Sequence, residues 1–170
     1  FESDITGSVN KYFGNLDVNI AGTGDVFIAH LDSSWFSGNL TINRYTAGNT
    51  VAFNAGATIN GNFSFTNNTT GYTSFGNLNY KTSIEGTINI NAVYLVPGIF
   101  AIQRLINKLN GGSIIIQNTQ GFEILNDTLK VTSMNVEGYR GNANGRLLNN
   151  SITGNVTLAD DASYAGGWYT

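Results

Sequence analysis

Apolar and polar residues alternate along most of this chain with a period of two. Apolar residues separated by a single polar residue recur at Leu16, Val18, Ile20, Leu40, Ile42, Phe63, Phe65, Ile88, Ile90, Val156 and Leu158. A strand with this alternation places one face on a core and leaves the other face in water. The pattern therefore predicts an all-β protein.

A glycine, a small polar residue and an apolar residue stand at the head of many of these segments. The glycines that begin this triplet are Gly14, Gly24, Gly38, Gly61, Gly76, Gly86, Gly112 and Gly154. Glycine adopts positive φ without strain, so each triplet is predicted to be a turn that leads into a strand. The intervals vary from 10 to 42 residues, whereas a solenoid repeats at a fixed period. The irregular spacing favours a β-sandwich or jelly roll, immunoglobulin-like in architecture, over a regular β-helix.

One segment, at about 97–109, departs from the strand pattern. Its apolar residues Ile99, Ile102, Ile106 and Leu109 recur at helical spacing. Pro97 suits the first turn of a helix, and the glycine at position 111 suits its C-terminal end. The spacing predicts a short amphipathic helix that packs on the sandwich.

The C-terminal half is predicted to return to strands. The residues 114–116 are all isoleucine and indicate a central strand, and 122–131 is predicted to form a hairpin around Asn126 and Asp127. The Gly/Asn-rich stretch 138–150 is predicted to be a long loop. The domain organisation expected is an N-terminal strand in 1–13 followed by a single β-sandwich domain in 14–170.

The composition narrows the environment and the partners of the protein. The 170 residues include 11% charged residues, no Cys, one His and 25 Asn, with a net charge of -3. Soluble domains average about 25% charged residues, so this surface is unusually neutral. No cluster of Lys and Arg supplies the basic surface that nucleic acid requires, and a Cys-based metal site is excluded. The chain begins at Phe1 rather than Met, and we expect a processed precursor or a fragment of a secreted or surface protein.

Candidate catalytic residues are few, and we expect neither an enzyme nor a cofactor or metal. His30 is the only imidazole, and its neighbours Asp32 and Ser33 are too close in sequence to indicate a triad. The acidic residues are dispersed and specify no carboxylate pair for glycoside hydrolysis.

Two candidate binding sites remain open from the sequence alone. Asp160, Asp161 and Asn155 offer oxygen ligands for calcium, although no EF-hand loop surrounds them. The aromatic side chains suited either to stack on a sugar or to fill the core are Trp35, Trp168, Tyr45 and Tyr72.

The chain also contains seven N-x-[ST] sequons, more than the roughly four that its composition alone would give. The candidate N-glycosylation sites are Asn39, Asn62, Asn67, Asn68, Asn126, Asn149 and Asn155.

The N-terminal segment is the most suggestive feature. Ile5, Gly7 and Val9 alternate with polar residues, and Phe13 precedes a glycine that shifts the phase of the next strand. Such a strand can pack on its own sheet or pair with an exposed sheet edge of a neighbouring molecule. Head-to-tail pairing of this kind does not close and produces a fibre.

In this N-terminal pattern and in its Cys-free, Asn/Thr/Gly-rich composition, the chain resembles subunits of donor-strand-complemented surface filaments. It is most similar to archaeal thread-type pilins and less so to bacterial chaperone-usher pilins, from which it differs by lacking a Cys pair. The resemblance implies a secreted subunit that polymerises with itself head to tail, with Ile5, Gly7, Val9 and Phe13 in the donor strand and N-linked glycans on its surface.

The leading hypothesis is thus a structural subunit of an extracellular filament, with a role in adhesion or biofilm formation. One alternative is a secreted carbohydrate-binding or adhesin β-sandwich. Another is a fragment of a lipid-transporting envelope protein, because the strand motifs of 112–158 resemble the repeating β modules of bacterial envelope-bridging proteins.

Overall fold

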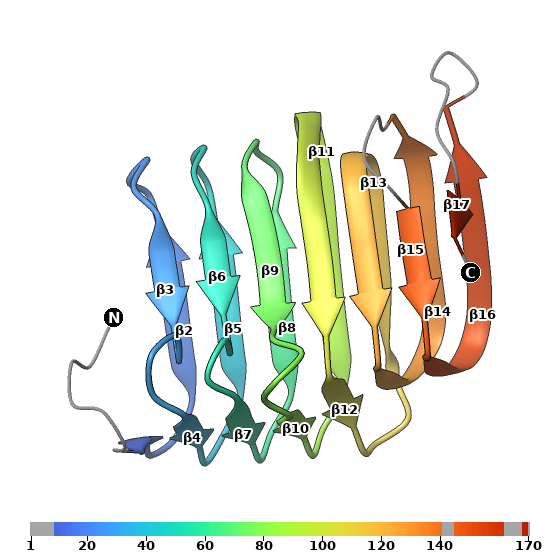
Figure 1. Ribbon diagram of the computed structural model, residues 1–170. Helices are drawn as coiled ribbons and strands as arrows, with labels where there is room; N and C mark the ends of the chain where they lie inside the picture. The colour runs from blue at the N-terminus through green and yellow to red at the C-terminus, as the bar shows by residue number, and fades with distance from the viewer. Residues whose placement is uncertain (1–8, 141–144, 162–167, 170) are drawn as a thin grey trace.

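The computed structural model describes residues 9–140, 145–161 and 168–169. In these residues every named element is a strand, and each strand pairs in parallel with strands of the coil before it, the coil after it or both. The result is a parallel β-solenoid of about 6 turns (Figure 1). The all-β prediction is confirmed, but the predicted sandwich or jelly roll is wrong.

Three stacks of strands form the three faces of the solenoid. The first face contains β1 (Asn10–Tyr12), β4 (Ser34–Phe36), β7 (Ala57–Ile59), β10 (Thr82–Ile84), β12 (Leu105–Asn107) and the beginnings of β14 (Thr128–Tyr139) and β16 (Ser151–Asp160). The second face contains β2 (Leu16–Ile20), β5 (Leu40–Arg44), β8 (Phe63–Asn67), the beginnings of β11 (Ile88–Gln103) and β13 (Gly112–Leu125), and the later parts of β14 and β16. The third face contains β3 (Val26–Ile28), β6 (Thr50–Ala52), β9 (Tyr72–Gly76), the later parts of β11 and β13, β15 (Gly145–Leu148) and β17 (Trp168–Tyr169).

A regular period does exist, although the glycine intervals concealed it. Asn10 pairs with Ser34, Ser34 with Ala57, and Ala57 with Thr82, which are steps of 24, 23 and 25 residues. Gly14, Gly38, Gly61 and Gly86 share the corner between the first and second faces, but Gly24 and Gly76 belong to the two other corners. Glycines from three corners thus overlap into one irregular series, and the expectation that excluded a regular β-helix is wrong.

The corner between the first and second faces requires glycine because successive coils approach closely there. A Cβ atom added to Gly61 would lie 2.5 Å from Asn39 Oδ1 and 2.6 Å from the carbonyl carbon of Gly38. The adjacent asparagines form a ladder, in which Asn39 N donates to Asn15 Oδ1 at 2.9 Å and Asn62 N donates to Asn39 Oδ1 at 2.8 Å. These side chains satisfy backbone donors that the corner would otherwise leave without a partner.

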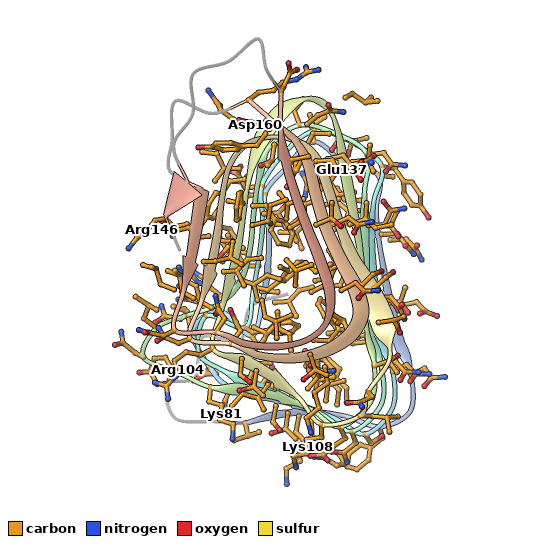
Figure 2. All side chains as sticks on the ribbon, turned by 90° about the vertical axis from the view of Figure 1, so that its right-hand side faces the viewer. Lys81, Arg104, Lys108, Glu137, Arg146 and Asp160 are labelled. Atoms are coloured by element: carbon orange, nitrogen blue, oxygen red, sulfur yellow. The ribbon has the colours of Figure 1, made fainter. Side chains whose placement is uncertain are left out.

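The interior is a filled hydrophobic core, as the view along the axis shows (Figure 2). Alternate residues of each strand point inward, so the period of two in the sequence becomes columns of stacked apolar side chains. The rings of Phe63 and Phe65 each lie about edge-on to Phe75, at centroid distances of 5.1 and 4.8 Å. Edge-to-face packing of this kind adds to the burial of aromatic surface.

The predicted helix at 97–109 is also wrong. This segment forms the end of β11 and all of β12, separated by Arg104 at φ 56. Phe100 and Ile102 point inward before the corner, and Leu105 points inward after it. The turn at Arg104 shifts the phase of the alternation, and a shifted period of two imitated helical spacing. Pro97 lies within β11 at an interruption of the register between Val93 and Gly98, where a strand tolerates proline.

The predicted hairpin at 122–131 is a third error. β13 and β14 are parallel and pair through 113–117 and 133–137, so residues 126 and 127 form a solenoid corner rather than a hairpin turn. The strand at 114–116 is confirmed. Of the predicted loop at 138–150, residues 138–139 and 145–148 are in strands, and 141–144 lie outside the described residues.

Candidate functional site

The two ends of the solenoid present strand edges, and these edges are the candidate site. Within the described residues, β2 pairs only with β5, and β16 pairs only with β14. In a stack of parallel strands each edge carries backbone N–H and C=O groups that can pair with another strand. The ends differ in this respect from the middle coils, whose strands have a neighbour on both sides.

The N-terminal end exposes part of the core. Leu16, Val18 and Val26 are half-buried and pack against the core cluster, whereas Leu40 and Ile42, one coil further along, are completely buried. The difference arises because no described strand covers the outer side of β2.

An apolar notch adjoins this end on the first face. Val9, Lys11, Phe13 and Trp35 line the notch. Phe13 is 79% exposed and lies edge-on to Trp35 at 5.7 Å, and Val9 is 51% exposed. Large apolar groups at such exposure are typical of contact surfaces.

The C-terminal end carries matching features on β16. Ile152 and Leu158 are half-buried against the core, and Val156 is 42% exposed. Asp160 ends β16, and the following residue, Asp161, accepts a hydrogen bond from Arg140 Nε at 3.1 Å.

The register of the coils aligns the two ends. Val18 begins a column that runs through Ile42, Phe65, Ile90, Ile114 and Met134 to Val156. The neighbouring outward column begins at Asp17 and ends at Asn155. A further coil placed on β16 in register would therefore set Val18 over Val156, and Asp17 over the neutral Asn155.

At the N-terminal end, the acidic residue Asp25 lies at the corner between the second and third faces. Asp25 accepts hydrogen bonds from Asn49 N at 3.0 Å and from Asn49 Nδ2 at 3.2 Å. These hydrogen bonds hold the pKa of the Asp25 carboxyl below its ordinary value, so the group is ionised at neutral pH. Asn49 Oδ1 in turn accepts a hydrogen bond from Tyr72 N at 2.9 Å and continues the ladder.

The predicted donor-strand residues divide between the solenoid and the undescribed terminus. Ile5 and Gly7 lie outside the described residues. Val9 and Phe13 are in the notch, and β1 between them pairs with β4 of the same molecule. Residues 10–12 are thus part of the first coil.

The other candidate sites do not assemble. Asn155 and Asp160 stand five positions apart on an extended strand, about 16 Å at 3.3 Å per residue, so they cannot share one calcium ion. No group of three or more His, Cys, Asp or Glu side chains that could hold a metal occurs in the described parts of the chain. His30 follows β3, and its ring packs on Phe27 at 4.7 Å.

The aromatic residues considered for sugar stacking do not form one platform. Trp35 is on the first face, whereas Tyr45 and Tyr72 flank the corner between the second and third faces. The side chain of Trp168 lies outside the described residues.

Sequence reasoning identified the apolar residues of both edges but missed their role. Val18, Ile20, Val156 and Leu158 were part of the alternating pattern, yet their position at the ends follows only from the stacking order. The intervals of 24, 23 and 25 residues between Gly14, Gly38, Gly61 and Gly86 were the signal that could have found it.

The comparisons with known proteins found no match to any family model, curated protein or solved structure. The described residues include no helix long and apolar enough to cross a bilayer.

Proposed function

We propose that this chain is a non-catalytic structural unit of an extracellular cell-surface filament, in which solenoids stack end to end. The observation that carries the proposal is the pair of complementary strand edges on β2 and β16. Because the two edges are different surfaces, each new contact leaves one edge of each kind open, and the product is an open fibre.

The pairing proposed here differs from donor-strand insertion into a sandwich. The fold has no incomplete sandwich for a strand to complete, and β1 pairs within its own coil. Instead, the β2 edge of one copy continues the parallel stack of the preceding copy beyond its β16. Main-chain hydrogen bonds extend across the junction as they extend between coils.

Side chains on the inward side of the strands support this contact. In register, Val18 covers Val156 and Ile20 covers Leu158 of the preceding copy. On the first face, Tyr12 covers Ile152. Full burial of a large aliphatic side chain stabilises by about 1.5–3 kcal/mol, so several such contacts can support assembly.

An extracellular location is supported by composition. Charged residues make up 11% of the chain, Cys is absent, and seven sequons are present. Between residues 33 and 80 the only charged residue is Arg44, which is buried, so this part of the lateral surface is a neutral array of Thr, Ser and Asn.

The alternatives receive less support from the geometry. A lipid-transporting fragment needs an open apolar groove, whereas the described coils enclose a core packed with Phe, Ile and Leu (Figure 2). A sugar-binding module of the kind considered needs its aromatic residues together, and they lie on separate parts of the surface.

The decisive experiment blocks each edge separately with a charge. Val18→Lys places a cation on the β2 edge, and Val156→Lys places one on the β16 edge. A charged residue at a strand edge opposes pairing because burial would desolvate it. Asn91→Lys, on an exposed position of β11 in the middle of the solenoid, is the matched control.

Filament formation is followed by negative-stain microscopy and light scattering. We expect fibres from the wild type and from Asn91→Lys, and monomers from each edge variant alone. A mixture of the two edge variants should form dimers, because one variant retains an open β16 edge and the other an open β2 edge. Monomeric wild type at high concentration, or fibres from both edge variants, would overturn the proposal.

A further inference from the structure

The structure divides the seven sequons into different environments. Asn67 is completely buried, and its Oδ1 accepts hydrogen bonds from Thr69 N at 2.9 Å and Thr69 Oγ1 at 2.7 Å. The hydroxyl of its own sequon is thus bound to the asparagine inside the solenoid. A glycan on Asn67 is incompatible with the folded chain.

Two further sequons belong to the asparagine ladder. Asn39 Oδ1 accepts from Asn62 N, and Asn62 Oδ1 accepts from Thr87 N at 2.9 Å and from Thr87 Oγ1 at 3.1 Å. Neighbouring coils approach so closely here that a glycine is needed at position 61. A sugar on Nδ2 of Asn39 or Asn62 would have to fit beside the hydrogen-bonded asparagines of the neighbouring coils.

The other four asparagines are exposed, but only two share a common geometry. Asn155 is on β16, the edge that the proposed stacking covers, and Asn68 is at the corner after β8 without left-handed backbone. Asn126 and Asn149 are exposed at φ 60 and 55, at the corner between the third and first faces. They occupy successive coils, since Asn126 N donates to Leu148 O at 2.9 Å.

In both of these sequons the middle residue anchors the corner. Asp127 Oδ1 accepts from Leu105 N at 2.6 Å, and Asn150 Oδ1 accepts from Asp127 N at 2.9 Å. The anchored middle side chain leaves the sequon asparagine outside. The hydroxyl residues that complete the sequons, Thr128 and Ser151, are paired in register in the outward column of the first face.

We propose that this corner is an N-glycan acceptor site, with Asn126 and Asn149 as the acceptor residues. The donor class is a lipid-phosphate-linked oligosaccharide, used by an oligosaccharyltransferase of the secretory route. The bond from the anomeric carbon to the phosphate oxygen breaks, a bond from that carbon to Asn Nδ2 forms, the amide proton leaves to the enzyme, and the lipid phosphate departs. The inference rests on the extracellular location in the proposed function.

The position of Asn126 and Asn149 on the solenoid is compatible with a glycosylated filament. The corner is on the lateral surface, whereas the proposed contacts use the ends, so glycans there would coat a fibre without blocking its growth. Adjacent strands are about 4.8 Å apart, which is too close for two sugars to be held side by side without crowding. We therefore expect mainly one glycan at the corner, distributed between the two asparagines.

The test is secretion from a eukaryotic host, followed by mass spectrometry of the occupancy at each sequon. Thr128→Ala removes the sequon of Asn126, and Ser151→Ala removes that of Asn149, while both retain the asparagine that the left-handed turn favours. Thr153→Ala, at an exposed position of β16 outside any sequon, is the matched control.

We expect glycan at the corner in the wild type and in Thr153→Ala, and an increase in Asn149 occupancy in Thr128→Ala of about twofold or more. Ser151→Ala should shift the glycan to Asn126. Folded, secreted protein without glycan at either asparagine would overturn the inference, and so would equal occupancy at Asn39, Asn62 or Asn67.

Material from a non-glycosylating bacterial host separates this inference from the proposed function. Filaments from that host, together with an unmodified corner in the secreted protein, would refute the acceptor site alone. A modified corner on a protein that stays monomeric from both hosts would refute the filament alone.

Discussion

The coils before residue 81 and the coils after it are built in different ways. The earlier coils have short strands of three to five residues, separated by Gly-Asn corners at nearly constant intervals. The later coils have strands of 16, 14 and 12 residues in β11, β13 and β14, with interruptions of register. Both halves still enclose one continuous core.

Charge is distributed just as unevenly. The segment 33–80 contains Arg44 alone, which is buried. The later coils carry surface ion pairs between adjacent coils, namely Lys108 with Glu85, Arg146 with Glu123, and Arg140 with Asp161. Side-chain amides connect neighbouring coils in both regions, but the later coils add ion pairs to them. The following predictions test how much each device contributes.

The largest effect is expected at Arg44, which is 1% exposed and whose guanidinium is held by four backbone carbonyl oxygens. It donates to the carbonyl oxygens of Thr46, Ala47, Asn49 and Gly24 at 2.8–3.0 Å. Burial lowers its pKa from the ordinary value, but the carbonyl oxygens solvate the cation.

Arg44→Met should reduce the free energy of unfolding by about 3–5 kcal/mol, since it leaves several buried carbonyls without donors. Arg44→Lys should share most of this loss because an ammonium cannot reach all four carbonyls. The measurement is urea denaturation, and a loss below about 1 kcal/mol in Arg44→Met would show that the corner does not depend on this side chain.

The next effect concerns Asp127 in the later coils, which is 2% exposed and has a buried Oδ2 without a hydrogen-bond partner. Burial raises the pKa of Asp127 to about 7, although hydrogen bonds from the backbone of Leu105 and Leu125 oppose the shift. The folded state therefore binds this proton more tightly than the unfolded state does. The stabilisation is present below about pH 4 and is lost as the pH rises to about 7.

Unfolding measured at pH 4.5 and at pH 8 should reveal a loss of about 3 kcal/mol for the wild type. Asp127→Asn should abolish most of this dependence because an amide does not titrate. Asparagine fits this corner, since Asn150 occupies the equivalent position of the next coil and its Nδ2 donates to Ile124 O. Asp17→Asn, on the exposed side of β2, is the control that should leave the dependence intact. Equal pH dependence in wild type and Asp127→Asn would assign the titration to another group.

A smaller effect is expected from the glycine corner of the early coils. Gly61→Ala should cost about 2–3 kcal/mol, because the added methyl group would contact Gly38 and Asn39 at distances that require backbone movement. Gly22→Ala is the matched control, since a Cβ at position 22 meets nothing within 4 Å. If the two variants unfold at the same urea concentration, close approach at this corner does not limit stability.

The smallest effect is expected at the surface ion pairs of the later coils. Arg146 Nη1 lies 3.0 Å from Glu123 Oε1, and both side chains are about one third exposed. Arg146→Gln should lower the free energy of unfolding by less than about 1 kcal/mol, and 1 M salt should reduce the difference further. A loss comparable with that of Arg44→Met would contradict the distinction drawn between the two halves.

The local pattern of apolar and polar residues was sufficient to predict the all-β class and the position of many strands. The alternation around Val18, Phe65 and Val156 correctly identified residues that point inward, because inward and outward positions follow from strand geometry alone. The same reasoning failed at 97–109, where a corner at Arg104 shifts the phase of the alternation. A corner of this kind cannot be predicted from the sequence where it contains no glycine or proline.

The candidate site depended more heavily on tertiary structure. The apolar character of Val18 and Val156 is evident from the sequence, but not that they stand at opposite ends of one column. The seven sequons are equally evident, yet only the stacked coils distinguish the buried Asn67 from the exposed Asn126.

The amino-acid sequence by itself determined the period of two, the glycine and asparagine corners and the low charge, because these are properties of single residues and their near neighbours. Tertiary structure alone decided that successive strands stack in parallel rather than fold back as hairpins. Strand pairing joins residues about 24 positions apart, such as Asn10 with Ser34, and a strand of given alternation suits a sandwich or a solenoid equally well. The choice came from the corners, where close backbone approach and side-chain amides hold each coil directly over the one before it.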